Sequence, residues 1–166
     1  MSNLKQIGLA LHMYSNDNAE AFPTAAAGAN GMESLGQLYS SYISDRKVFR
    51  CASDTGVTEL TNLQLTAGTA TVANTGFTAA RCSYGYDDRH TAVDDPGVAI
   101  AADAKGLGVT LSDNHAQKGQ NVLYIDGHVE WKGTSTCGYY NGTSYDAIYT
   151  DNLATLGTAT DTYIDN

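Results

Sequence analysis

Residues 121–132 read Asn-Val-Leu-Tyr-Ile-Asp-Gly-His-Val-Glu-Trp-Lys, and no other stretch constrains the fold of this chain as strongly. Asp-Gly between two alternating apolar runs is a strong signal for a β-hairpin. A two-residue type I′ turn needs positive φ at both central positions, which Asp-Gly tolerates. The sequence therefore predicts a hairpin with Asp126 and Gly127 at its tip.

This turn also predicts which side chains share a face of the hairpin, because facing residues lie on the same side of the sheet. One face would carry Val122, Tyr124, Val129 and Trp131. The other would carry Leu123, Ile125, His128 and Glu130. The first strand is apolar on both sides, so a further element must cover its second face.

The charge balance argues against a nucleic-acid partner. The 166 residues suit a single domain, and 18 acidic against 9 basic side chains give a net charge of -9. Phosphate binding requires a basic face, which this chain lacks. Charged residues make up only 16% of the chain, and eleven tyrosines suit half-buried, wet positions. This composition is typical of an extracellular, β-rich surface.

Three cysteines, Cys51, Cys82 and Cys137, allow three single-disulfide pairings. No two are close enough in sequence for a CxxC metal knuckle or redox motif, so a zinc site is not expected. If the protein is exported, one bridge is expected, and Cys51 with Cys82 is the preferred pairing. The alternative is that all three are small buried hydrophobic residues.

Apolar spacing predicts helices first and strands afterwards. Leu4, Ile7, Leu11 and Tyr14 recur at helical spacing, so residues 1–17 form an amphipathic helix that starts at Met1 like the lower part of a longer one. No apolar run approaches the ~20 residues of a membrane span. A second helix is expected at 32–43. Strands are expected at 48–51, as a pair within 57–78, at 81–86, at 98–102, in the two hairpin arms and at 145–149. Helices followed by antiparallel strands define an α+β fold.

Six segments in this order resemble a known family. They are residues 2–11 (Ser-Asn-Leu-Lys-Gln-Ile-Gly-Leu-Ala-Leu), residues 14–18, Phe22-Pro23, Val48-Phe49-Arg50-Cys51 with Ser53-Asp54, Ser83-Tyr84-Gly85-Tyr86 and the hairpin at 121–131. Together they are similar to type IV pilin-like and type II secretion pseudopilin-like proteins that carry a prepilin-type processing-associated His...Asp-Gly domain. His115, Asp126 and Gly127 match the motif of that domain.

The resemblance implies a non-enzymatic structural subunit of an extracellular or periplasmic filament. Such subunits are exported, and a hydrophobic half-helix, which would precede Met1 here, anchors them in the inner membrane before assembly. The partners would be other copies of the chain and the pilus or secretion machinery, with membrane contact only through that missing half-helix. The family fold is pilin-like, an N-terminal helix on an antiparallel sheet. Residues 1–20 would be the lower helix, 21–132 the head and 133–166 an acidic, Tyr-rich extension of the same domain. The helix stripe Leu4, Ile7, Leu11 and Tyr14 would pack in the filament core.

The chain departs from the family pattern in two places. Ten residues separate His115 from Asp126, one more than in the family motif, and Ala52 stands where the family has proline after the cysteine. The first departure puts in doubt any role that depends on a fixed distance between His115 and Asp126. A functional interpretation makes these two a metal or charge-paired site. The structural interpretation, which we favour, is that His115 hydrogen-bonds a backbone carbonyl or Asp126 and holds the hairpin.

No cofactor is required by the sequence, although calcium is an open option. Asp87, Asp88 and Asp113 are weak calcium candidates, because no loop has the ligand spacing of an EF-hand. The chain contains no Gly-x-Ser-x-Gly elbow, HExxH helix or phosphate-binding glycine loop. Two alternatives to the filament subunit stay open. One is a secreted module that binds polysaccharide or a protein partner, calcium-stabilised or not, and the other is a metal-dependent hydrolase centred on His115 and Asp126.

Overall fold

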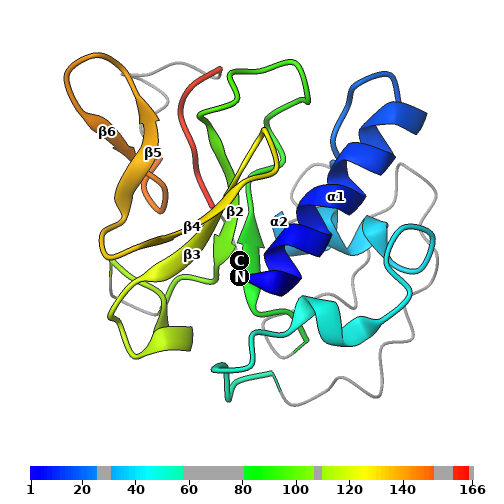
Figure 1. Cartoon of the computed structure of the whole chain (residues 1–166), viewed down its shortest axis with the longest axis horizontal. Coiled ribbons are helices and arrows are strands. Elements are labelled where there is room, and N and C mark those ends of the chain that lie inside the picture. The colour runs from blue at the N-terminus through cyan, green and yellow to red at the C-terminus, as the bar shows by residue number, and fades with distance from the viewer. Residues whose placement is uncertain (26–30, 58–80, 107–109, 152–158, 165–166) are drawn as a thin grey trace.

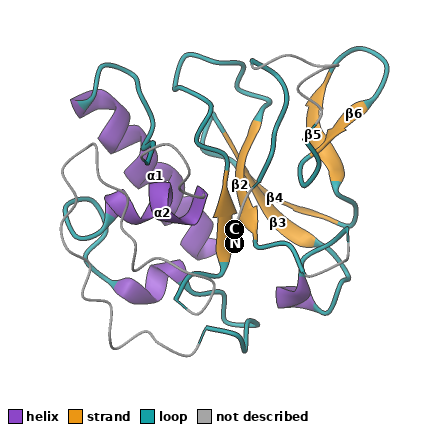
Figure 2. Cartoon of the chain, turned by 180° about the vertical axis from the view of Figure 1, so that it is seen from behind, coloured by secondary structure: helices purple, strands orange, loops and turns teal. Residues whose placement is uncertain are grey.

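The computed structural model describes residues 1–25, 31–57, 81–106, 110–151 and 159–164. All described helical elements except the turn at 113–115 precede the strands in the chain. The helices are α1 (Ser2–Asp17) and α2 (Gly31–Leu35), and the 3-10 turns are η1 (Gly36–Leu38), η2 (Arg46–Phe49) and η4 (Asp113–His115). Helices α1 and α2 lie to one side of the strands (Figure 2). The strands are β1 (Tyr84–Tyr86), β2 (Ala99–Asp103), β3 (Gln120–Tyr124), β4 (Val129–Lys132), β5 (Thr136–Tyr140) and β6 (Tyr145–Ala147).

The central sheet is antiparallel and lies between two layers. Its strands are ordered β1-β2-β3-β4, and β5 pairs with β6 in a separate two-stranded sheet. Helix α1 lies on one side of the central sheet and β5–β6 on the other (Figure 1). The predicted α+β class, with an N-terminal helix packed on an antiparallel sheet, is confirmed.

Helix α1 uses its predicted apolar stripe to contact the sheet. Leu4, Ile7 and Leu11 are fully buried and Tyr14 is 8% exposed. Gly8 lets the helix approach β3 closely, because a Cβ at this position would lie 2.8 Å from Leu123 Cδ1. Within the described part of the chain, no helix combines the length and apolarity needed to cross a membrane.

Both faces of the inner strands β2 and β3 are buried, as the two-sided apolar character of residues 121–125 predicts. Leu123 and Ile125 belong to the core on the α1 side. Val122 and Tyr124 belong to a second core that contains Cys137, Ile148, Tyr149 and Ile164. The C-terminal segment is therefore the element that covers the second face of the sheet.

The hairpin forms, but its predicted register is wrong by one residue. Leu123 pairs with Val129, and Asn121 pairs with Trp131. The loop is longer than a two-residue turn: the Gly127 N–H donates to the Tyr124 carbonyl at 2.9 Å, and only Gly127 has positive φ, at 85°. A type I turn followed by a left-handed glycine explains this geometry.

A one-residue shift moves every side chain of the second arm to the opposite face. Val129 therefore joins Leu123 in the α1-side core instead of joining Val122 and Tyr124. Trp131 follows Val129 to that side and is 46% exposed. On the other face, His128 stacks on Tyr124 with ring centroids 4.3 Å apart.

Two other predicted elements differ from the structure, and one strand was not predicted. Residues 48–51 are not a strand, because Asp45 caps the 3-10 turn η2 by accepting from the Lys47 N–H at 2.9 Å. The second helix is shorter than 32–43: α2 ends at Leu35, and η1 continues it only to Leu38. The sequence reading missed β5, whereas the expected strand at 145–149 is present as β6. The strands expected within 57–78 fall almost wholly outside the described residues.

Candidate functional site

The short turn η4 places His115 beside the end of β2. Ser112 precedes the turn, and its hydroxyl accepts from the Asn114 N–H at 3.2 Å. The buried Asn114 side chain donates from Nδ2 to the Ser83 carbonyl at 2.8 Å, which fixes the turn against the loop before β1. These contacts hold the His115 ring next to Asp103, the last residue of β2.

Three donor side chains meet at this point: Cys51, Asp103 and His115. His115 Nε2 lies 3.0 Å from Asp103 Oδ2 and 3.5 Å from Cys51 Sγ. The three ligand atoms all lie within 4.8 Å of one another. In the described ranges this is the only group of three or more His, Cys, Asp or Glu side chains with such proximity.

Asp103 is fully buried and is the most heavily hydrogen-bonded member of the group. Its Oδ2 accepts from the backbone N–H of Asn121 at 2.7 Å and from Asn121 Nδ2 at 2.9 Å. Its Oδ1 faces Asn114 Nδ2 at 3.4 Å. A buried carboxylate is costly unless such donors replace the water it has lost. The surrounding amides therefore fix the position of the Asp103 side chain at the end of β2.

The contact between Cys51 and His115 does not have the geometry of a nucleophilic Cys-His-Asp triad. Burial raises the pKa of the Cys51 thiol, and the nearby Asp103 carboxylate raises it further, against a lowering contribution from the Ser53 backbone N–H. In a nucleophilic triad, the thiol and the acid bind different nitrogens of the imidazole. Here both face Nε2. The group therefore lacks the geometry of a Cys-His-Asp relay, and its three donors converge on one point in space.

Trp131 covers one side of the group. Its ring meets the His115 ring edge-on, with centroids 5.0 Å apart. The His115 side chain is still 19% exposed, whereas that of Asp103 is fully buried. The site is thus closed on the Asp103 side and open to water beside His115.

His115 does not contact Asp126, which answers the question raised by the extra residue between them. His115 precedes β3 and Asp126 follows it, so they lie at opposite ends of a five-residue strand. Asp126 Oδ1 instead accepts from the backbone N–H of His128 at 2.9 Å and pairs with His128 Nδ1. Asp126 therefore caps its own turn.

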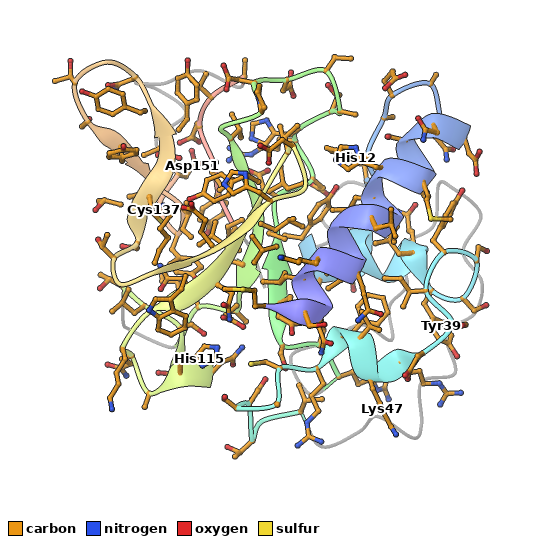
Figure 3. All side chains as sticks on the ribbon, viewed as in Figure 1. His12, Tyr39, Lys47, His115, Cys137 and Asp151 are labelled. Atoms are coloured by element: carbon orange, nitrogen blue, oxygen red, sulfur yellow. The ribbon has the colours of Figure 1, made fainter. Side chains whose placement is uncertain are left out.

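His12 is the histidine that lies beside the tip of the hairpin, whereas His115 lies at its other end (Figure 3). His12 Nε2–H donates to the Ile125 carbonyl at 2.7 Å. A Cβ at Gly127 would lie 3.8 Å from the same nitrogen. The hairpin tip is therefore held by helix α1 and not by His115.

The expected disulfide between Cys51 and Cys82 is not present, and all three cysteines are free and buried. Cys51 Sγ faces His115, whereas Cys82 Sγ donates to the Tyr84 carbonyl at 3.3 Å. Burial raises the pKa of Cys82 to about 12 and that of Cys137 to about 11. The alternative expectation, that the cysteines serve as small buried residues, describes Cys82 and Cys137.

The calcium candidates lie in separate hydrogen-bonding environments. Asp88 Oδ2 accepts from the Ser34 hydroxyl at 2.5 Å, and Asp113 Oδ1 accepts from Gln117 Nε2 at 2.9 Å. The Asp87 carboxylate is occupied by the Arg89 guanidinium at 2.8 and 2.9 Å and by the Tyr163 N–H at 2.6 Å. These carboxylates make ordinary structural contacts.

Asp87 lies at the centre of a buried ionic network that fastens the C-terminal segment to the sheet. Burial would raise its pKa, but hydrogen bonds from His90, Arg89 and the Tyr163 backbone outweigh this and lower it to about 2. Burial lowers the pKa of His90, and contacts with Asp87, the Asp161 carbonyl and Asp94 reverse the effect, so its pKa is raised. His90 Nε2–H donates to that carbonyl at 3.0 Å. The network joins residues 87–90 to residues 161–163.

Sequence reasoning named Cys51 and His115 but missed Asp103 and Asn121. The residues lie far apart in the chain, so no short motif joins them. One signal was available: Asp103 is the single charged residue at the end of the apolar run 98–102. A charged side chain at the end of a buried strand requires hydrogen-bonding or ionic partners. His115 is one of these partners.

Comparisons of the chain with protein-family models, with curated proteins and with solved structures find no match in any of the three. The structure shows an N-terminal helix packed against an antiparallel sheet, together with one convergent group of donor side chains. Function has to be inferred from these residues.

Proposed function

We propose that the chain is the globular head of a type IV pilin-like or pseudopilin-like filament subunit that is exported and has no enzymatic activity. The observation that carries the proposal is the exposed apolar side of α1. Leu9 is 65% exposed and Met13 is 46% exposed, on the side of the helix that faces away from the sheet. Residues four apart lie next to each other on a helix, so the two form one apolar patch.

The contact surface expected from the sequence needs correction. Leu4, Ile7, Leu11 and Tyr14 are buried in the core of this same chain, so they cannot contact a neighbouring subunit. Leu9 and Met13 take over that role in the proposal. They border a groove of about 210 Å³ that is also lined by Gln6, Ala10, Tyr42, Ile43, Ser44, Asp45 and Val48.

The groove gives the apolar patch a shape that a helix can occupy. An amphipathic helix binds another protein by laying apolar side chains into such a groove. If the helix of one copy enters the groove of the next, the contact is heterologous, and it propagates as a filament when the rotation between copies does not close into a ring. The free helix face and the groove beside it therefore suit a repeating subunit.

The solution size of the protein at rising concentration tests this contact. We expect the wild-type chain to associate and Leu9→Glu with Met13→Glu to remain monomeric. Val93→Glu is the matched control, because Val93 is 74% exposed and does not line the groove. A wild-type chain that stays monomeric at every concentration, or a control that loses association equally, would contradict the proposal.

The gene sequence upstream of the Met1 codon gives an independent test. A filament subunit of this class requires a short basic leader followed by an apolar helix. We expect the reading frame to continue upstream through both. A stop codon in frame directly before Met1 would remove the proposal.

A second candidate function is a binding module for polysaccharide, and a groove between the hairpin and β5–β6 favours it. This groove has a volume of about 310 Å³. Its lining combines aromatic rings with charged groups, namely Asp95, Tyr124, His128, Glu130, Lys132, Tyr139, Tyr140 and Tyr145. Tyr140 and Tyr145 are 50% and 57% exposed, and their rings lie 4.8 Å apart. Such rings offer an apolar face beside a polar hydroxyl.

Binding of a panel of soluble glycans distinguishes the two candidates. If the groove is a sugar site, Tyr145→Ala weakens glycan binding and leaves self-association unchanged. Leu9→Glu has the opposite effect. Tyr163→Ala is the control, since Tyr163 is 37% exposed and does not line this groove. No glycan binding by the wild-type chain would remove the second candidate.

A further inference from the structure

We propose that Cys51, Asp103 and His115 bind one divalent transition metal of the zinc class. The proposal is independent of the filament function. The donor set contains one thiolate sulfur, one imidazole nitrogen and one carboxylate oxygen. Zinc accepts all three types, and a site with three protein ligands leaves its fourth position for water.

The distances between the donor atoms fit a tetrahedral ion. Zn–S of about 2.3 Å and Zn–N of about 2.0 Å imply that sulfur and nitrogen lie about 3.5 Å apart in a tetrahedron. Cys51 Sγ and His115 Nε2 are 3.5 Å apart. Nitrogen and oxygen ligands would lie about 3.3 Å apart, and His115 Nε2 is 3.0 Å from Asp103 Oδ2. The third pair, Cys51 Sγ and Asp103 Oδ2, lies within 4.8 Å, against about 3.6 Å for sulfur and oxygen in a tetrahedral site.

The charges and the surroundings also fit a divalent ion. A thiolate at Cys51 and a carboxylate at Asp103 together carry two negative charges, which a divalent cation neutralises in a buried place. Binding would release the Cys51 proton to solvent. Asn121 donates to Asp103 through its backbone N–H and through Nδ2, so it acts as an outer contact that orients a ligand.

The open position lies on the His115 side. The His115 side chain is 19% exposed, whereas Asp103 is fully buried and Cys51 is 7% exposed. Water can therefore reach the ion from this side. Calcium does not fit the group, because calcium takes six to eight oxygen ligands and has no preference for sulfur.

A metal here would join three segments of the chain. Cys51 follows η2, Asp103 ends β2, and His115 ends η4. The η2 turn also contacts helix α1, whose Asn3 donates from Nδ2 to the Arg50 carbonyl at 2.7 Å. The ion would thus connect the base of the helix to the sheet, and we expect it to raise the melting temperature.

Cobalt(II) is the probe for this site, because its spectrum reports both the ligands and their geometry. The full chain is reduced, stripped of metal with a chelator and titrated with Co²⁺. We expect saturation at one equivalent, a sulfur-to-cobalt charge-transfer band and the intense visible bands of a tetrahedral ion. Trp131 is the only tryptophan and lies beside His115, so its emission should be quenched as the ion binds. Mg²⁺ should change none of these signals.

Matched variants assign the ligands. Cys51→Ser should abolish the charge-transfer band and weaken Co²⁺ binding at least tenfold. Cys137→Ser removes another buried free thiol and should behave as wild type. His115→Gln should also weaken binding at least tenfold, which keeps the test decisive if Cys51→Ser does not fold. The proposal is overturned if folded wild-type protein binds no Co²⁺, or if the band survives in Cys51→Ser or disappears in Cys137→Ser.

Discussion

His115 Nε2 lies 3.0 Å from Asp103 Oδ2, so the histidine of the His...Asp-Gly motif pairs with the end of β2 and not with Asp126. The contact joins residues from either side of the β2–β3 connection, next to the first residues of β3. Asp126 lies at the far end of β3, in the turn that it caps. The two halves of the motif therefore hold opposite ends of the same hairpin.

A double-mutant cycle in the presence of a chelator should separate these pairings. We expect His115→Gln and Asp103→Asn to couple by about 0.5–3 kcal/mol in the free energy of unfolding, since their side chains touch. His115→Gln and Asp126→Asn should be additive within about 0.5 kcal/mol. Urea denaturation of the three single and two double variants provides the measurement. Strong coupling between His115 and Asp126 would contradict the structure.

The two sides of helix α1 should respond differently to truncation. Leu11 is fully buried, so Leu11→Ala should lower the free energy of unfolding by about 2–5 kcal/mol. Leu9 is 65% exposed, so Leu9→Ala should change it by less than about 0.5 kcal/mol. Both replacements introduce the same residue into the same helix, which makes them mutual controls. Equal costs in dilute, monomeric protein would show that the helix is rotated.

The left-handed glycine of the hairpin gives a test of the observed turn. Gly127 has φ of 85°, so Gly127→Ala should cost about 1–2 kcal/mol through the backbone alone. A Cβ at Gly127 meets only the His12 ring, at 3.8 Å. Gly133→Ala is the control, because a Cβ there has no neighbour within 4 Å. Thermal unfolding compares the two, and a Gly127→Ala variant as stable as Gly133→Ala would argue for another turn.

Acid should weaken the attachment of the C-terminal segment through Asp87. Its pKa is lowered from 3.8 to about 2 in the folded chain. A lowered pKa contributes stability that is present above 3.8 and lost as pH falls towards 2, here on the order of 2 kcal/mol. Urea denaturation of the wild type and of Asp87→Asn should therefore give a stability difference that shrinks between about pH 4 and pH 2.

His90 contributes to the pH dependence of stability with the opposite sign to Asp87. Its pKa is raised above 6.5, so its stabilisation is complete below that pH and is lost as pH rises through the higher folded value. His90→Gln should remove this loss on the alkaline side. It should also make the acid-side loss smaller, because the His90 hydrogen bond is one of the contacts that lower the pKa of Asp87. A wild-type profile that is flat from pH 4 to pH 2 would exclude the Asp87 contacts.

Free cysteines predict a simple alkylation pattern. Native protein should react slowly with iodoacetamide, since Cys82 and Cys137 are 1% and 5% exposed and burial raises the pKa of both thiols. Protein denatured without reductant should take up three alkyl groups, as counted by intact mass. Uptake of one group would show that two of the three cysteines form a disulfide.

The sequence by itself determined the local elements with strong periodicity. The stripe of Leu4, Ile7 and Leu11 predicted α1 and its apolar side, because helical spacing places these residues on one face. The continuous apolar run of residues 122–125 predicted β3 and the need for a covering layer on each of its faces. Both features depend on the spacing of residues that are close in the chain, and this spacing can be read from the sequence.

Only the tertiary structure decided the hairpin register and the partner of His115. The register depends on whether Asp126 and Gly127 form a two-residue turn or part of a longer one, and Asp-Gly is compatible with both. The longer turn places Val129 in the core against α1. The packing of the helix therefore decides between the two turns. Local sequence could not decide it.

The proximity of Cys51, Asp103 and His115 was also decided only by the tertiary structure. Its members lie 52 and 12 residues apart in the chain, and the sheet brings them together because β2 ends beside the start of β3. Sequence supplied the residue types, whereas the strand order β1-β2-β3-β4 supplied the distances. Chemistry that depends on convergence of distant side chains becomes visible only when the chain has folded, because proximity in space is set by strand pairing and not by spacing along the chain.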